Sequence, residues 1–517
     1  MKTTEMRKQE ILKNEMNTHS NNSVSIEVNN FGPISEAKVD LRPLTVLVGP
    51  SNTGKSYFAI LVNALQRSLS RTRNYPPYYY DIELEIGSIS YSKFSKIIKK
   101  TAESLLKQLE LENQENLEFD HDFQELVKNI FNKRLSTFSN NEILRCFGID
   151  DVNSLSRRGK QNSAQIKVKT SAMCSENLEN HSIELSPKPK HNFIFPSSLP
   201  LPPEKIKIKR LTEAAENVLQ DSKNSEKRGR ISRFEIMRFL NAIISIIKPL
   251  IIGPLDSQAF YLPADRTGIM HAHTVVVNSL IASAPMAGLR KTTGQATMTG
   301  VLADFLEQLI EIGSPRIRRR KRDKDLSKGI EKEILKGRVN IKSSEEINYP
   351  IFTYQPKGWA EDLPLANASS MISELAPIVL FLRYAIRPGM LLIIEEPESH
   401  LHPAMQVELT NQLANLVNEG IRVVVTTHSE WMVEALANIV YRSKITEKYD
   451  AENSNRKIAL NEDQVGLWLF QKNRKQKGTV VKEIKLDDAG QYPIDYDDVA
   501  IALHNDWAEI TEEIVNS

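Results

Sequence analysis

The segment Val46-Leu47-Val48-Gly49-Pro50-Ser51-Asn52-Thr53-Gly54-Lys55-Ser56 decides the fold of this 517-residue chain. Its second part matches the pattern GxxxxGK[ST], in which two glycines let the backbone curl around an anion. The residues before it form an apolar run typical of a buried strand, and apolar residues at helical spacing follow it as far as Leu69. A chance match in a loop of small residues is the alternative, and the flanking strand and helix argue against it.

The loop of residues 49–56 is expected to bind the phosphates of ATP. Successive backbone N–H groups, together with the N-terminus of the following helix, would point at phosphate oxygens. Lys55 would reach the β- and γ-phosphates, and the Ser56 hydroxyl would be a ligand of Mg²⁺. The residues predicted to bind the nucleotide here are Gly49, Pro50, Ser51, Asn52, Thr53, Gly54, Lys55 and Ser56.

A second apolar run, residues 391–394, leads directly into Glu395 and Glu396. Such a run is typical of a fully buried parallel strand, and ligands bind beyond the carboxyl ends of such strands. Adjacent side chains of a strand point in opposite directions, so one carboxylate can hold Mg²⁺ while the other faces the γ-phosphate. We expect Glu395 to be the metal ligand and Glu396 to orient or deprotonate the attacking water. A solvated strand end is the alternative.

A third apolar run, residues 423–425, ends in Thr426-Thr427-His428-Ser429. A histidine at the tip of a neighbouring strand can contact the γ-phosphate and respond to its presence. Taken alone, such a histidine is more often a helix cap or a surface residue. Its place shortly after Glu396 favours the sensor role, so His428 is the second predicted catalytic residue.

Roughly 340 residues separate the phosphate loop from the second apolar run, far more than one strand–helix unit requires. We therefore expect an insertion within an α/β domain. The predicted organisation is a flexible leader (1–22), an N-terminal core lobe with the phosphate loop (23–70), a mainly helical insert serving as a lid or oligomerisation domain (71–250), a C-terminal core lobe (251–440) and a C-terminal extension of the core (441–517).

The composition is that of an ordinary globular protein, with 40% hydrophobic and 26% charged residues and a net charge of +2. This balance excludes a chain that is basic throughout. The two cysteines, Cys146 and Cys174, lack metal-site spacing and fit a reducing compartment. No apolar stretch approaches the roughly 18 residues of a membrane span, and the leader lacks an apolar core. These features predict a cytoplasmic protein without membrane contact.

The stretch Glu395-Glu396-Pro397-Glu398-Ser399-His400-Leu401-His402-Pro403, taken with Thr427-His428-Ser429, resembles the ABC-type ATPases of the SMC, RecF and overcoming-lysogenization-defect group. The Phe31-Gly32-Pro33-Ile34 leader makes the chain most similar to the AAA-like members of that group. The resemblance implies an α/β fold, with an ABC-type P-loop ATPase core and a mostly helical insert before the signature and Walker B segments. It also implies that residues 397–401 cross a dimer interface as the D-loop and that His428 is the H-loop switch.

The same resemblance identifies a signature segment, Asn367-Ala368-Ser369-Ser370-Met371-Ile372-Ser373-Glu374-Leu375. It implies that Ser370 contacts the γ-phosphate held by the P-loop of another subunit, and a hydroxyl at a helix N-terminus is a sound anion site. Met371 and Ile372 stand where transporter signatures have two glycines, which argues against a transporter ATPase. Simple capping of the helix by Ser369 or Ser370 is the alternative.

A further departure concerns the loop that supplies a glutamine to the metal in this group. The matching position is the end of the apolar run Phe260–Leu262, which continues into Pro263-Ala264-Asp265-Arg266. No glutamine stands there. Asp265 or Arg266 could serve near the phosphates, and a structural salt bridge is an equal alternative.

The strongest basic segment runs from Arg316 to Lys324, and a second lies around Lys205 to Arg210. Such clusters can contact nucleic acid, although few aromatic residues accompany them. A solvated loop or a protein-docking surface is the alternative.

Fewer than a hundred residues follow His428, so the Toprim nuclease domain of OLD-type proteins would not fit there. The acidic Asp495-Tyr496-Asp497-Asp498 is interpreted as a helix start. We therefore predict an ATP- and Mg²⁺-dependent ATPase that forms a homodimer or higher homo-oligomer around ATP and controls a separate effector, possibly a nuclease. The resemblance extends to ATPase subunits of anti-phage systems of the PARIS-like or Septu-like kind. A RecF-like repair clamp that binds DNA and a non-hydrolysing scaffold are the alternatives.

Overall fold

The computed structural model describes fifteen parts of the chain. They are residues 24–70, 91–111, 116–157, 163–171, 180–185, 190–192, 198–200, 205–224, 231–272, 298–314, 317, 325–343, 350–446, 458–473 and 478–485. The predicted leader, most of the basic segment at 316–324 and the acidic tetrad at 495–498 lie outside these parts.

One sheet of eleven strands organises the molecule. In sheet order its strands are β7 (Lys190–Asn192), β6 (Asn180–Leu185), β5 (Gln165–Ser171), β1 (Val24–Phe31), β2 (Ile34–Asp40), β16 (Gly478–Ile484), β15 (Val465–Asn473), β3 (Leu44–Val48), β14 (Arg422–Thr427), β13 (Leu391–Glu395) and β9 (Ala259–Leu262). From β15 to β9 every neighbouring pair is parallel, whereas β7 to β2 pair antiparallel. The phosphate loop follows β3, in the parallel half.

The parallel strands are buried on both faces, as their continuous apolar sequences predict. All five residues of β13 are buried, with Leu391 and Ile393 in one hydrophobic core and Leu392 and Ile394 in another. β3 divides in the same way. The three predicted strands that carry the site are thereby confirmed, and they lie side by side in the order β3, β14, β13.

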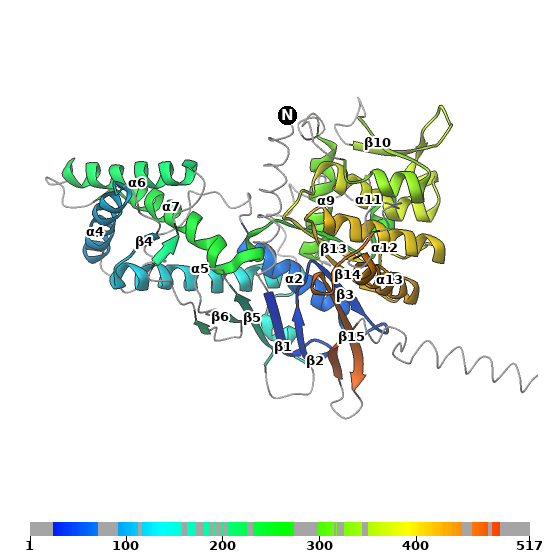
Figure 1. Cartoon of the computed structure of the whole chain (residues 1–517), viewed down its shortest axis with the longest axis horizontal. Coiled ribbons are helices and arrows are strands. Elements are labelled where there is room, and N and C mark those ends of the chain that lie inside the picture. Colours follow the sequence, from blue (N-terminus) through cyan, green and yellow to red (C-terminus); the bar gives the residue numbers. More distant parts are fainter. Residues whose placement is uncertain are drawn as a thin grey trace, which may run out of the picture.

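Helices cover both faces of this sheet (Figure 1). The first core contains α2 and the helices of the insert, and the second contains α9, α11, α12 and α13. Their bounds are α2 (Lys55–Leu69), α4 (Tyr91–Leu109), α5 (His121–Phe147), α6 (Lys205–Asn224), α7 (Arg233–Ile252), α9 (Gly300–Gly313), α11 (Ser370–Tyr384), α12 (Pro403–Asn418) and α13 (Glu430–Thr446). The structure is thus an α/β fold whose central sheet lies between two helical layers.

Helices α4, α5, α6 and α7 form an arm that projects to one side of the sheet (Figure 1). α5 joins the arm to the body because its C-terminal half packs against α2. The insert is not exclusively helical, since β5, β6 and β7 continue the main sheet beyond β1. The sheet therefore crosses the predicted boundary at residue 71. At the other end of the chain, β15 lies between β16 and β3, in the middle of the sheet.

Two small sheets complete the described structure. The first is a hairpin of β10 (Gly337–Ser343) and β11 (Pro350–Pro356), with Val339 opposite Tyr354, and β12 (Leu363–Pro364) pairs with β11. Strands β4 (Asn116–Glu118) and β8 (Ser198–Pro200) pair within the insert. None of the described helices is both long enough and apolar enough to cross a membrane.

Candidate nucleotide site

The phosphate loop holds Lys55 in a buried position at the start of α2. The Lys55 ammonium donates hydrogen bonds to the carbonyls of Gly49 at 2.7 Å and Pro50 at 2.9 Å. Burial lowers the pKa of Lys55 to about 8, and the nearby carboxylates Glu396, Glu398 and Glu395 oppose this shift. A buried cation whose present partners are neutral carbonyls is suited to binding an anion.

The two glycines of the loop are required by its backbone and by its surroundings. Gly49 has φ +136° and Gly54 has φ +98°, which L side chains rarely adopt. A Cβ at Gly49 would lie 2.3 Å from the carbonyl oxygen of Phe470 in β15. The C-terminal strand β15 therefore leaves no room for any other residue at this point of the loop.

Glu395 ends β13 with its carboxylate buried. Its Oε2 accepts a hydrogen bond from the backbone N–H of Ala264 at 3.2 Å. Burial and the neighbouring Glu395 carboxylate raise the pKa of the Tyr261 hydroxyl. A buried carboxylate at the end of a parallel strand fits a ligand or water ligand of Mg²⁺. The Ser56 hydroxyl, one residue beyond Lys55, provides the second predicted oxygen ligand.

Glu396 and His428 are in direct contact. His428 Nε2 donates to Glu396 Oε1 at 2.9 Å, and His428 Nδ1 lies 3.5 Å from the Lys55 ammonium. The hydrogen bond from His428 holds the pKa of the Glu396 carboxyl below its ordinary value. Glu396 also has φ +41°, an uncommon conformation for a side chain of this kind and one that is often found at functional sites. The structure thus brings together three of the predicted residues from three different strand ends.

Glu398 is part of this arrangement, although no sequence pattern predicted a role for it within its own subunit. Its Oε1 accepts hydrogen bonds from the His428 backbone N–H at 2.7 Å and from the Thr427 hydroxyl at 2.6 Å. The carboxylate therefore fixes the end of β14 next to Glu396. Its place two residues after Glu396, in the segment predicted to be the D-loop, was the only available signal.

The signature segment places its serines at an exposed helix N-terminus. Ser369 is the N-cap of α11 and Ser370 is its first residue; both are exposed. The Ser369 side chain makes no capping hydrogen bond, so the capping alternative is not what the structure shows for that residue. Two hydroxyls beside helix N–H groups are therefore available on the surface. Among the described residues, neither Ser369 nor Ser370 forms a hydrogen bond with the P-loop of the same subunit.

Arg266 resolves one alternative that the sequence left open. Its guanidinium is completely buried and pairs with Glu374 of α11. It also donates to the backbone carbonyl of Glu396 at 3.0 Å. The salt-bridge interpretation is therefore the correct one for Arg266, while Asp265 is exposed.

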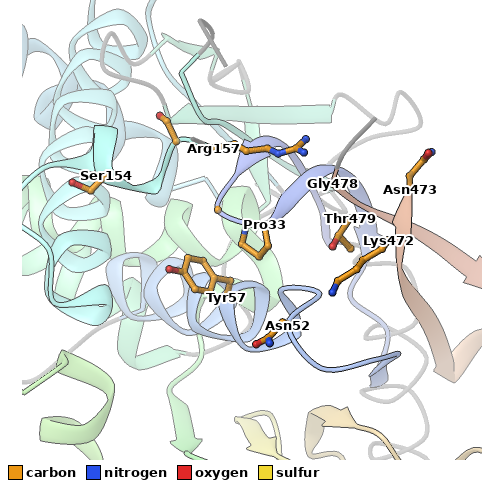
Figure 2. A pocket seen from close by; sticks show the side chains of 11 residues that line it. Pro33, Asn52, Tyr57, Ser154, Arg157, Lys472, Asn473, Gly478 and Thr479 are labelled. Carbon is orange, nitrogen blue, oxygen red and sulfur yellow. The ribbon is translucent and has the colours of Figure 1, made fainter. Parts of the chain in front are cut away.

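A cavity of about 890 Å³ adjoins the phosphate loop (Figure 2). Four segments line it: the β1–β2 turn, the P-loop with the start of α2, the insert loop before β5 and the β15–β16 hairpin. The lining residues are Gly32, Pro33, Asn52, Tyr57, Ser154, Ser156, Arg157, Lys472, Asn473, Gly478 and Thr479. They include two cations and no carboxylate, and sequence reasoning did not identify this site.

The family model described as AAA ATPase domain matches residues 24–433. This is most of the chain, and the chain therefore belongs to that family of ATPase domains. No curated protein matches it.

Solved SMC head domains show a remote similarity. An SMC head bound to the C-winged helix domain of ScpA is 11% identical with a TM-score of 0.39, covering 90% of this chain and 98% of that chain. The SMC head domain from Thermotoga maritima is 10% identical with a TM-score of 0.33, covering 89% and 98%. An Smc head with an extended coiled coil, bound to the C-terminal domain of ScpA and derived from Pyrococcus furiosus, is 9% identical with a TM-score of 0.36, covering 90% and 98%. Similarity at this level transfers no ligand or partner to the present chain.

Proposed function

We propose that this protein is an ATPase that hydrolyses ATP to ADP and phosphate with Mg²⁺ as cofactor. The observation that carries the proposal is the contact chain Lys55–His428–Glu396, with distances of 3.5 and 2.9 Å, at the carboxyl ends of three adjacent strands. A buried cation for phosphate and an ionised carboxylate for water therefore lie at one point of the fold. Membership of the AAA ATPase domain family supports the same activity.

Each residue has a separate task in this proposal. The Lys55 ammonium leaves the Gly49 and Pro50 carbonyls and pairs with phosphate oxygens. Glu396 accepts a proton from water as that water attacks the γ-phosphorus and the bond to the bridging oxygen of ADP breaks. His428 keeps Glu396 ionised and aligned. Mg²⁺, held by Ser56 and Glu395, would neutralise developing negative charge on the phosphates.

We assign the cavity beside the P-loop to the nucleoside part of ATP. It begins at Asn52 in the phosphate loop and continues past Tyr57 and Pro33, whose apolar surfaces can cover a base. Arg157 and Lys472 supply positive charge at its edge. Its volume of about 890 Å³ exceeds what a base and a ribose need, in line with the range of small-molecule sites.

The exposed Ser370 supports a composite site. A hydroxyl at the N-terminus of a helix such as α11 is suited to binding an anion. No hydrogen bond between Ser370 and the P-loop of the same subunit is present among the described residues. In this proposal Ser370 contacts the γ-phosphate bound by a second copy of the chain, so ATP binding joins two subunits and hydrolysis separates them. ATP would then act by shifting a monomer–dimer equilibrium.

The decisive experiment is the conservative substitution Glu396→Gln. Turnover should fall by roughly 10²- to 10⁴-fold because the base is lost, while binding of ATP is retained. ATP should also bind more tightly than inorganic triphosphate, because inorganic triphosphate lacks the nucleoside that we assign to the cavity. Unchanged turnover in Glu396→Gln would disprove the catalytic assignment and favour the non-hydrolysing scaffold.

The role in anti-phage defence rests on the sequence resemblance alone and forms the last part of the proposal. The ATP-dependent dimer would control a separate effector protein, such as a nuclease, in the cytoplasm. Co-purification of the protein with the product of a neighbouring gene, dependent on ATP, would support this. Stimulation of ATP turnover by duplex DNA, lost when the cations at 316–324 are neutralised, would instead favour the DNA-repair clamp.

A further inference from the structure

Arg266 is the largest fully buried polar side chain of the described chain, and its hydrogen bonds converge on residues 395–398, here called the catalytic loop after the proposed role of Glu396. Its Nε donates to the Glu374 carbonyl at 3.1 Å and its Nη1 to the Pro263 carbonyl at 2.9 Å. The same guanidinium donates to the carbonyls of Glu395 and Glu396. One side chain thus contacts three separate segments: the end of β9, the end of β13 and α11.

The carbonyls of Glu395 and Glu396 belong to the residues whose side chains were assigned to Mg²⁺ and to water. The φ of +41° at Glu396 has to be maintained by its surroundings, because a residue with a Cβ is strained there. Arg266 donates a hydrogen bond to the backbone carbonyl of Glu396 itself, and the backbone N–H of Glu396 donates to the Thr426 carbonyl at 2.9 Å. Both sides of the strained residue are therefore fixed.

The partner of Arg266 connects it to the signature segment. Glu374 lies one helical turn after Ser370 in α11, and its carboxylate pairs with Arg266 and also accepts a hydrogen bond from Thr267. A shift or rotation of α11 would therefore move Arg266. Since α11 begins at the exposed serines, it is the element that a second subunit would reach first.

We propose that Arg266 is a positioning residue that aligns Glu396 for catalysis and couples its alignment to the position of the signature helix α11. The inference rests on the proposed function. It assigns a regulatory link within one subunit. Contact at Ser370 would change the position of Glu374, Glu374 would move the guanidinium of Arg266, and the guanidinium would shift the carbonyl of Glu396. In this way a subunit could adjust its own catalytic carboxylate when its α11 engages the nucleotide of the other subunit.

A purely structural ion pair would behave differently. Buried ion pairs contribute little net stability, and exchange of both partners for apolar residues of similar volume is often neutral or stabilising. The double variant Arg266→Met with Glu374→Leu removes both charges together, so no buried charge is left unpaired, and it removes the guanidinium donors from the carbonyls of Glu395 and Glu396. A positioning role predicts that this double variant remains folded and is catalytically poor.

The test compares Arg266→Lys and the double variant with wild type. We expect kcat to fall about 100-fold in both, as for misplacement of a reacting group by about 1 Å, while the affinity for a non-hydrolysable ATP analogue changes less than about threefold. The acidic limb of the pH–rate profile should also move to higher pH, because a displaced Glu396 loses the hydrogen bond from His428 that holds its pKa down.

Arg383 provides the matched control. It is another buried arginine, on α11 itself, and it pairs with Glu331 and Asp325 and donates to the Val339 carbonyl without contacting the catalytic loop. Arg383→Lys should lower the melting temperature and leave kcat per folded molecule and the pH profile unchanged.

Two results separate this inference from the proposed function. If Glu396→Gln abolishes turnover and the apolar double variant retains wild-type kcat, the positioning role is disproved and the ATPase assignment stands. If Glu396→Gln leaves turnover intact, the ATPase assignment itself fails, whatever Arg266 does. A double variant with low kcat and equally weakened analogue binding would also overturn the inference, since that pattern indicates general damage to the site.

Discussion

At the scale of single residues, burial decides the chemistry of the site. Lys55 is 5% exposed and its pKa lies at about 8, whereas Glu396 keeps a lowered pKa because His428 donates a hydrogen bond to it. Lys55 therefore loses its proton more easily than an exposed lysine, whereas the Glu396 carboxylate stays ionised. An anion that replaces the Gly49 and Pro50 carbonyls stabilises the protonated form of Lys55.

This predicts a pH dependence of nucleotide binding. Above pH 8 the Lys55 ammonium loses its proton before ATP arrives, so the dissociation constant should rise by up to about tenfold per pH unit; below pH 8 it should be nearly constant. The terminal phosphate ionises near pH 6 and does not titrate in this window. Calorimetric titration between pH 7 and 9.5 would measure the effect.

Lys55→Arg is the control for this measurement, since an arginine remains protonated throughout the range. Its dissociation constant, whatever its size, should not change between pH 7 and 9.5. A wild-type dissociation constant that is equally flat would contradict the lowered pKa of Lys55.

Arg266 and Glu398 show what single-residue reasoning could not find. Both residues stand in segments that the sequence analysis singled out, Arg266 after the apolar run 260–262 and Glu398 directly after Glu396 and Pro397. Their partners, however, are about 30 to 130 residues away in the chain, as for Glu398 with His428 and Arg266 with Glu396. Contacts of that separation follow from the packing of strand ends, which no local pattern encodes.

At the scale of elements, a buried charge cluster joins three helices around the foot of the arm. Arg67 of α2 and Arg145 of α5 share the carboxylates of Glu142 on α5 and Asp304 on α9. Arg145 donates to both oxygens of Asp304, at 2.9 and 2.7 Å. Because α2 begins at the phosphate loop, this cluster ties the arm to the element that carries Lys55.

We expect Asp304→Asn to destabilise the protein by about 2 kcal/mol, because it leaves the largely buried Arg67 and the one-third exposed Arg145 with one carboxylate, and solvent screens part of the loss at Arg145. Hydrogen exchange should increase at the C-terminal end of α5 before it does so in the parallel strands. Urea denaturation and mass-spectrometric hydrogen exchange measure the two effects.

The exposed pair Lys209–Glu213 on α6 is the comparison for this variant. Its atoms are 3.9 Å apart and its side chains are 76% and 44% exposed, so Lys209→Gln should alter stability by less than about 0.5 kcal/mol. Equal losses for the two substitutions would show that the cluster does not hold the arm.

At the scale of the whole molecule, the proposed function makes the site half of a composite. The P-loop face contains Lys55, Glu395 and Glu396, while Ser369 and Ser370 are exposed at the N-terminus of α11. Each subunit would therefore contribute one P-loop and one signature helix to each of two sites. The arm, which projects away from the sheet (Figure 1), is the competing place for self-association.

The two surfaces can be distinguished in the Glu396→Gln background, where bound ATP persists. ATP and Mg²⁺ should produce a dimer in analytical ultracentrifugation, and an added Ser370→Arg should abolish it without loss of ATP binding to the monomer. Ser92→Arg, at an exposed serine of α4 on the arm, should leave the dimer intact. The opposite pattern would place the interface on the arm.

The sequence by itself indicated the α/β fold class and the three strands that carry the candidate site, and it singled out Lys55, Glu395, Glu396 and His428 as candidates, because each lies in the short segment that follows an apolar run. Only the tertiary structure decided what holds these residues in place. It brought β15, from the C-terminal part, against Gly49, it built the cavity from four distant segments, and it enclosed Arg266 between Glu374 and the catalytic loop. The physical reason is that burial and hydrogen bonding across sheet neighbours depend on the order of the strands, which adjacent residues do not specify.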